Sequence, residues 1–263
     1  WDRRTVAAPV YDHLLIDEAQ FFAPVWFDLL LKVLRPGGHL FLCADPTQGF
    51  LRRRHSWSKL GIDVRSRCHQ LEKSYRSSRA VLQFAAQFYR SRLPDDDEPL
   101  NLPSSAWLDS ICEGTKPIVK PISGGENQLR DLISELKAFR EGGGVLGDVL
   151  VLIAGIDLKP KQVAERLSAQ IGTKFVGEIS RNDFPETALG VTHLMAATGL
   201  ERPVIFLLGI DELFAKEKSA ALDQGERDDL IRDHTRQNYV GHTRAIERLV
   251  IYSTSSIFGN EQS

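Results

Sequence analysis

Two acidic residues, Asp17 and Glu18, directly follow the apolar run Leu14-Leu15-Ile16. Acids at the carboxyl end of a parallel strand lie where α/β sheets bind ligands. Asp17 is suited to hold Mg²⁺ through water, because phosphate-bound magnesium usually takes one or two carboxylates, and Glu18 is suited to polarise a water that attacks a γ-phosphate. The plainer interpretation is a helix that begins after a strand, where acidic residues are favoured by the helix dipole.

A second apolar run, residues 40–44, ends in the polar sequence Asp-Pro-Thr-Gln at 45–48. Gln48 at this strand end would sense a γ-phosphate and report its presence to neighbouring elements. The alternative is a strand followed by an ordinary Asp-Pro turn.

Two arginines stand where helices begin or end. Arg76 precedes Ser77, which is placed to cap the following helix, and Arg244 is expected near the end of another helix, projecting outward. Arginine suits a γ-phosphate because its planar fork donates two hydrogen bonds and stays charged. Tyr75 offers a ring on which adenine would stack. Taken singly, each residue is equally well explained as a surface arginine or a core tyrosine.

In their order along the chain, these motifs resemble motifs II, III, IV and VI of UvrD/Rep-type superfamily 1 DNA helicases, as LxxDEAQ, ADPTQ, LExSYRS and YVxxTRA. Gly199-Leu200-Glu201, followed by the apolar run 203–207, looks like motif V. The resemblance extends from Tyr11 to Tyr252, which is nearly the whole chain.

That resemblance implies ATP and Mg²⁺ as cofactors and assigns a role to each motif residue. Asp17 and Glu18 would bind the metal, and Glu18 would also be the general base. The other implied catalytic residues are Gln48, Arg76 and Arg244, of which the two arginines are arginine fingers. The implied nucleotide contacts are Gln20, Tyr75, Gly199 and Glu201, with Tyr75 on the adenine and Glu201 on the ribose.

The hydrophobic pattern predicts an α/β fold. Short apolar runs predict buried strands at 11–16, 40–44, 148–153, 203–208 and 248–252, and helix-period stretches lie at 24–34, 77–90, 127–140, 161–171 and 226–246. Such alternation favours parallel sheets covered by helices. The resemblance implies two RecA-like domains, residues 1–66 and 67–263, with ATP between them and the first domain only partly present.

The sequence departs from the helicase pattern at the phosphate-binding loop. No GxxxxGK[ST] occurs in it. Because this loop precedes the DEAQ strand in the family, and because the chain begins at Trp1 rather than methionine, we expect the loop in a missing N-terminal part of the same protein. The strand before Asp17 would then lack its partner and present an apolar edge. Only about 40 residues separate the strand at 148–153 from motif V, so the large insertion of the family is absent.

Evidence for DNA contact is local. Arg53 and His55, in a basic run followed by Trp57, combine charge with an aromatic ring as a single-strand track would, although a solvated basic loop with a core tryptophan is the alternative. In motif V, Met195 and Thr198 replace a histidine and a lysine of the family, and His193 is the candidate substitute. The net charge of -2 and pI near 6.4 exclude a surface coated in positive charge.

Three dispersed cysteines without a CxxC pair indicate neither a zinc site nor a disulfide framework and favour a reducing cytoplasm. No apolar run reaches the roughly 18 residues needed to cross a bilayer, so no membrane partner is expected.

The leading hypothesis is an ATP-dependent single-strand DNA helicase or translocase, acting on single strands or junctions, with 3′-to-5′ direction implied by the resemblance alone. Activity would belong to the full-length protein, and this part alone would be inactive. One alternative is a nucleotide-gated module of a larger defence or repair protein, with a nuclease or repair partner. The other is a catalytically inactive relic that binds DNA or serves as a scaffold.

Overall fold

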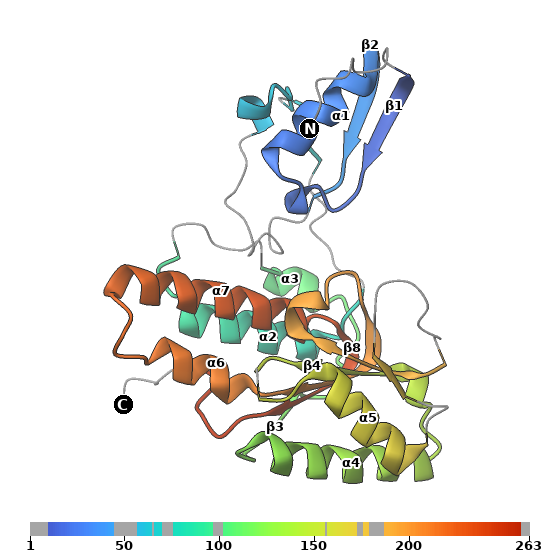
Figure 1. Cartoon of the computed structure of the whole chain (residues 1–263), viewed down its shortest axis with the longest axis vertical. Helices are drawn as coiled ribbons and strands as arrows, with labels where there is room; N and C mark the ends of the chain where they lie inside the picture. Colours follow the sequence, from blue (N-terminus) through green and yellow to red (C-terminus); the bar gives the residue numbers. More distant parts are fainter. Residues whose placement is uncertain are drawn as a thin grey trace. The chain divides into compact units, whose positions relative to one another are not determined.

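The computed structural model describes residues 10–44, 57–64, 66–69, 76–96, 102–155, 157–172, 176–178 and 187–258. The chain divides into two compact units, residues 1–71 and 72–263, whereas the sequence placed the division between residues 66 and 67. Each unit contains a parallel sheet, of two strands in the first and six in the second, with helices packed against it (Figure 1). The α/β class expected from the sequence is confirmed.

The first unit is small. It consists of β1 (Tyr11–Ile16), a 3₁₀ turn (Ala19–Phe21), α1 (Pro24–Val33), β2 (Leu34–Leu42) and a second 3₁₀ turn (Trp57–Leu60). The predicted strand start at residue 40 is wrong, because β2 begins directly after α1. Its core is formed by Ile16, Ala19, Phe27 and Ile62.

The other face of this two-stranded sheet is exposed. Pairing aligns His13 with His39 and Leu15 with Phe41, and all four side chains are exposed. The two imidazole rings stack at 5.2 Å, and the exposed fractions are 75% for Leu15 and 60% for Phe41. The apolar surface that the sequence predicted at the edge of this sheet therefore also covers its outer face. Parallel sheets are normally covered on both faces.

The second unit is a larger three-layered structure. Its strands are β3 (Ile118–Lys120), β4 (Val149–Ile153), β5 (Val176–Glu178), β6 (Leu189–His193), β7 (Arg202–Leu208) and β8 (Ala245–Tyr252), in the order β3-β8-β7-β4-β6-β5 and all parallel. Its helices are α2 (Arg79–Arg92), α3 (Ser105–Leu108), α4 (Gly125–Glu141), α5 (Pro160–Ile171), α6 (Ile210–Glu217) and α7 (Gln224–His242). Strands β3, β5 and β6 and helices α3 and α6 had not been predicted.

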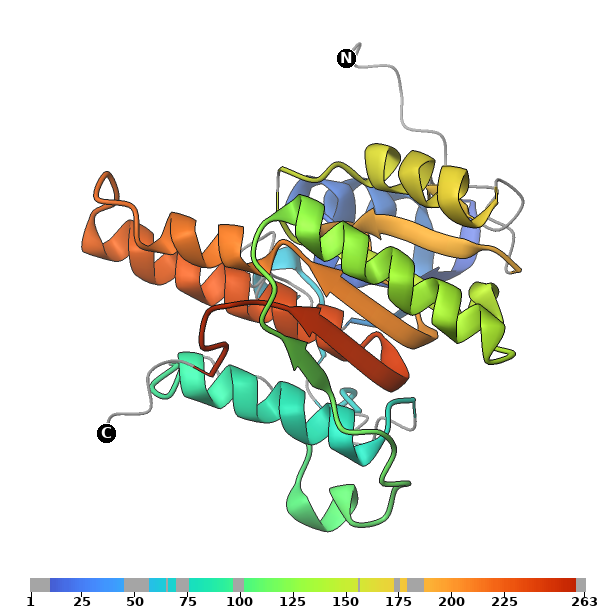
Figure 2. The same ribbon diagram turned by 90° about the horizontal axis from the view of Figure 1, so that it is seen from below.

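Alternate residues of the central strands enter two separate apolar layers. On β4, Val149, Val151 and Ile153 pack with the leucines of α4 and the aliphatic residues of α5. Leu150 and Leu152 point the other way, into a layer shared with α2 and α6. Figures 1 and 2 show α4 and α5 together on one face of the sheet, and α2, α6 and α7 on the other. Both faces of this sheet are thus covered.

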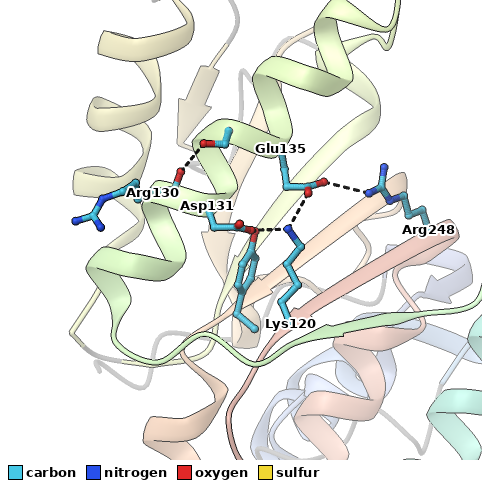
Figure 3. A network of polar contacts seen from close by, with 7 residues as sticks. Lys120, Arg130, Asp131, Glu135 and Arg248 are labelled. Carbon is cyan, nitrogen blue, oxygen red and sulfur yellow. Dashed lines mark hydrogen bonds and ion pairs between the residues drawn. The ribbon is translucent and has the colours of Figure 1, made fainter.

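A polar network fastens the edge strand β3 to α4 (Figure 3). Lys120 Nζ lies 2.6 Å from Asp131 Oδ2 and 2.7 Å from Glu135 Oε1. Glu135 also pairs with Arg248 of β8, and the Tyr252 hydroxyl donates to Asp131. Burial lowers the pKa of Lys120, but its hydrogen bonds to the two carboxylates outweigh this effect and the pKa is raised. The ammonium group therefore stays charged and holds β3 in place.

Because Leu15 and Phe41 form an exposed apolar face on the first unit, we expect this 263-residue chain to self-associate. Leu15→Lys places a charge at the centre of that face, and we expect the dissociation constant of self-association, measured by sedimentation equilibrium, to rise at least about ten-fold. Val145→Lys is the matched control, because Val145 is 58% exposed and belongs to the second unit. An equal effect of both substitutions would show that added charge, rather than this face, governs association.

Candidate functional site

The two strands of the first unit end at the same place. Ile16 pairs with Leu42, and the backbone continues the ladder when Cys43 N donates to Ile16 O at 2.8 Å and Ala19 N donates to Cys43 O at 2.9 Å. Asp17 and Glu18 lie between these bonds, at the carboxyl end of β1. The position predicted for the two acids is therefore the one they occupy.

Glu18 has an unusual backbone conformation. Its φ of 52° and ψ of 40° lie in the left-handed region, which costs a non-glycine residue about 1 kcal/mol or more. Gln20 Nε2 donates a hydrogen bond to Glu18 Oε2. The contact of Gln20 with the nucleotide stays a prediction, and in the structure its side chain lies against the carboxylate of Glu18.

The two acids at this strand end, Asp17 and Glu18, are of the residue type that hard divalent cations prefer. Asp17 is exposed, and its Oδ1 accepts a hydrogen bond from Glu18 N at 2.9 Å. Within the described residues no group of three or more His, Cys, Asp or Glu side chains lies close enough to hold a metal by itself. Magnesium is commonly held by one or two carboxylates with water and phosphate oxygens, so a single exposed aspartate is compatible with it.

In the second unit, three sequence motifs meet at the amino-terminal edge of the six-stranded sheet. Ser78 N donates to Ile246 O at 2.7 Å, and Arg202 N donates to Arg244 O at 3.2 Å. Arg76 Nη1 lies 2.5 Å from Glu201 Oε1. Segments far apart in sequence, around residues 76, 201 and 244, are therefore neighbours.

The Arg76–Glu201 ion pair lies at the surface, because 67% of the arginine side chain and 27% of the glutamate side chain are exposed. Exposed pairs contribute little free energy, typically about 0–1 kcal/mol. An incoming polyanion can therefore replace the carboxylate at low cost.

Gly199 turns the chain into β7 with a φ of 76°, a conformation that favours glycine.

The predicted orientation of Arg244 is wrong. Helix α7 ends at His242, and Arg244 lies in the turn before β8 with only 6% of its surface exposed. Its Nε donates to Val240 O at 3.2 Å, so the guanidinium lies at the negative end of the helix dipole. The helical period of the sequence predicts a helix through residue 246, but α7 ends at His242 and Arg244 folds back onto its terminal carbonyls.

Two further predicted residues are described, one in each unit. Trp57 is half-buried and packs edge-on against Phe27 at 5.6 Å, and His193 is exposed at the end of β6. The predicted residues Gln48, Arg53, His55 and Tyr75 lie outside the described residues.

Sequence reasoning did not single out His242, which lies two residues before Arg244. It is completely buried, and its ring makes edge contacts with Phe84 and Phe88 at 5.4 and 4.8 Å. Neither ring nitrogen has a hydrogen-bond partner among the described residues. Burial lowers the pKa of His242 to about 3, so the imidazole is neutral at physiological pH. The one sequence signal for this burial is helical spacing, because His242 lies four residues after Asn238 and eight after His234, which are also buried on α7.

Comparison with known proteins gives a partial similarity to helicases. No protein-family model matches the chain. An ATP-dependent DNA helicase PcrA from Leuconostoc citreum is 37% identical over 86 residues, which are 31% of this chain and 11% of the relative. The chain thus spans a small part of that relative.

A solved structure, the C-terminal domain of a possible DNA helicase from Lactobacillus plantarum WCFS1, matches 71% of this chain and 92% of its own, with 14% identity and a TM-score of 0.42. In the described part of our chain, no helix has both the length and the apolarity needed to cross a membrane.

The position of Arg244 predicts a contribution to stability. Arg244→Met leaves the end of α7 without its cationic cap, and we expect the free energy of unfolding to fall by about 1–2 kcal/mol in urea denaturation. Arg76→Met, which removes an exposed ion pair, should change it by less than about 1 kcal/mol. Equal losses in the two variants would contradict the capping role.

His242 predicts an acid-sensitive fold. An unfolded histidine has a pKa near 6.5, and because folding lowers this pKa to about 3, the unfolded state binds more protons between these values. The contribution of neutral His242 to the free energy of unfolding is therefore fully present above about pH 6.5 and is lost progressively as the pH falls toward 3. The expected loss is about 2 kcal/mol at pH 5. In His242→Leu this part of the pH dependence should disappear, whereas His193→Leu, at an exposed position, should keep it.

Proposed function

We propose that this chain is the C-terminal part of an ATP-dependent DNA helicase or translocase motor, whose phosphate-binding loop is supplied by residues outside these 263. The observation that carries the proposal is the convergence of Arg76, Glu201 and Arg244 at one edge of the second unit. The partial identity to an ATP-dependent DNA helicase supports the same assignment.

The residues of the first unit would act at the phosphates. Asp17 would hold Mg²⁺, which neutralises phosphate charge when bound. Glu18, oriented by Gln20, would accept a proton from the attacking water, and Gln48 would sense the γ-phosphate. The general base would accelerate ATP hydrolysis by a factor of about 10²–10⁴.

The residues of the second unit would recognise the nucleotide by charge and hydrogen bonding. Arg76 would exchange its partner Glu201 for phosphate oxygens, and the released carboxylate would accept hydrogen bonds from ribose hydroxyl groups. Arg244 would act as the second arginine finger. Its burial at the end of α7 means that this guanidinium is held in place before any nucleotide arrives. Tyr75 would stack on the adenine.

For DNA, we propose single strands or junctions as the substrate class. In the first unit, Arg53, His55 and Trp57 would contact the strand. In the second unit, His193, which is exposed at the end of β6, would be a further contact. The net charge of -2 requires that contact be local, and binding should therefore have a modest salt dependence.

The general base is tested in the full-length protein. Glu18→Gln should lower DNA-stimulated ATP turnover at least about a hundred-fold and leave ATP binding within about two-fold, because the amide cannot accept the proton. Asp12→Asn is the matched control and should leave ATP turnover within about two-fold. Asp12 is an exposed carboxylate of β1, the strand that leads to Glu18, and it forms an ion pair with Arg35.

Turnover that survives Glu18→Gln would remove Glu18 from the mechanism. An unmodified protein that binds DNA but does not hydrolyse ATP would instead support the inactive alternative.

A further inference from the structure

Ser77 links the two arginine-bearing turns of the second unit. It follows Arg76 directly, it is 5% exposed, and its Oγ donates to the carbonyl oxygen of Thr243 at 3.1 Å. Thr243 directly precedes Arg244. A side chain adjacent to one arginine is thus bonded to the backbone adjacent to the other.

This hydrogen bond is not the one that the sequence predicted. Helix α2 begins at Arg79, and its N-cap is Ser78 rather than Ser77. Ser78 makes no side-chain capping bond, and its buried Oγ has no hydrogen-bond partner in the described part of the chain. The hydroxyl of Ser77 therefore bonds to the turn that carries Arg244, whereas the hydroxyl of Ser78 bonds to neither arginine-bearing turn.

The acceptor lies at the end of α7, where carbonyl groups lack partners within the helix. Val240 O accepts from Arg244 Nε and from Thr243 Oγ1, and Gly241 O accepts from Arg244 N. Ser77 Oγ completes this set by bonding the carbonyl of Thr243. The conformation of the Arg244 turn therefore depends in part on a residue of the Arg76 segment.

We propose that Ser77 is a positioning residue that fixes the spacing between Arg76 and Arg244, so that both guanidinium groups meet one polyphosphate. The inference rests on the proposed function. The backbone bond from Ser78 N to Ile246 O remains when the hydroxyl is removed, so the two turns loosen without separating. Small misplacements of positioned groups can cost a reaction up to about a hundred-fold.

The test is steady-state ATPase kinetics of the full-length protein. Ser77→Ala should lower kcat about ten-fold while KM for ATP changes less than about two-fold, because the hydroxyl acts on the placement of charged groups rather than on nucleotide affinity. Ser78→Ala is the matched control and should keep kcat within about two-fold. Ser77→Thr, which retains the hydroxyl, should keep at least about half of kcat.

A double-mutant cycle separates positioning from a general loss of structure. If Ser77 acts through Arg76, then Ser77→Ala should have little further effect on kcat in an Arg76→Ala background. Additive effects, equal losses in Ser77→Ala and Ser78→Ala, or unchanged kcat in Ser77→Ala would each overturn the inference. An unmodified protein without ATP turnover would overturn the proposed function and this inference with it.

Discussion

A parallel sheet commonly carries apolar side chains on both faces, and both faces are then normally covered. In the second unit this requirement places α4 and α5 on one side and α2, α6 and α7 on the other (Figures 1 and 2). After each strand, the connecting segment must bring the chain back to the end of the sheet where the next parallel strand begins. The end of α7 and the starts of β7 and β8 are thereby gathered at the amino-terminal edge, where the arginine motifs meet.

The sequence predicted those elements whose pattern is local. Strand β4 and the carboxyl-terminal parts of β7 and β8 are continuous apolar runs, and the long helices show a clear helical period. Strand β3 is only three residues long, and β6 contains Gly190 and Thr192, so neither gives a strong signal. Their places in the sheet come from pairing with distant strands, which composition alone does not reveal.

The same limit applies to the candidate site. Residue types and order indicated Asp17, Glu18, Arg76 and Glu201, and the structure brings Arg76 to Glu201 although nothing in the sequence joins them. The predicted orientation of Arg244 is wrong because the guanidinium donates to a carbonyl at the end of α7, and the position of that carbonyl depends on the residue at which the helix stops. The predicted capping role of Ser77 is wrong for a related reason, since α2 begins at Arg79 and its N-cap position is occupied by Ser78.

Glu18 has a left-handed backbone conformation, which non-glycine residues adopt only at a conformational cost. Glycine would adopt these angles without steric cost, so selection for stability alone would favour its presence there. A glutamate at this position therefore carries a conformational cost of about 1 kcal/mol or more that glycine would not carry. Among the described residues, Glu18 and Ser66 are the non-glycine positions with a positive φ, and Glu18 is the one of the two that the motif also indicates.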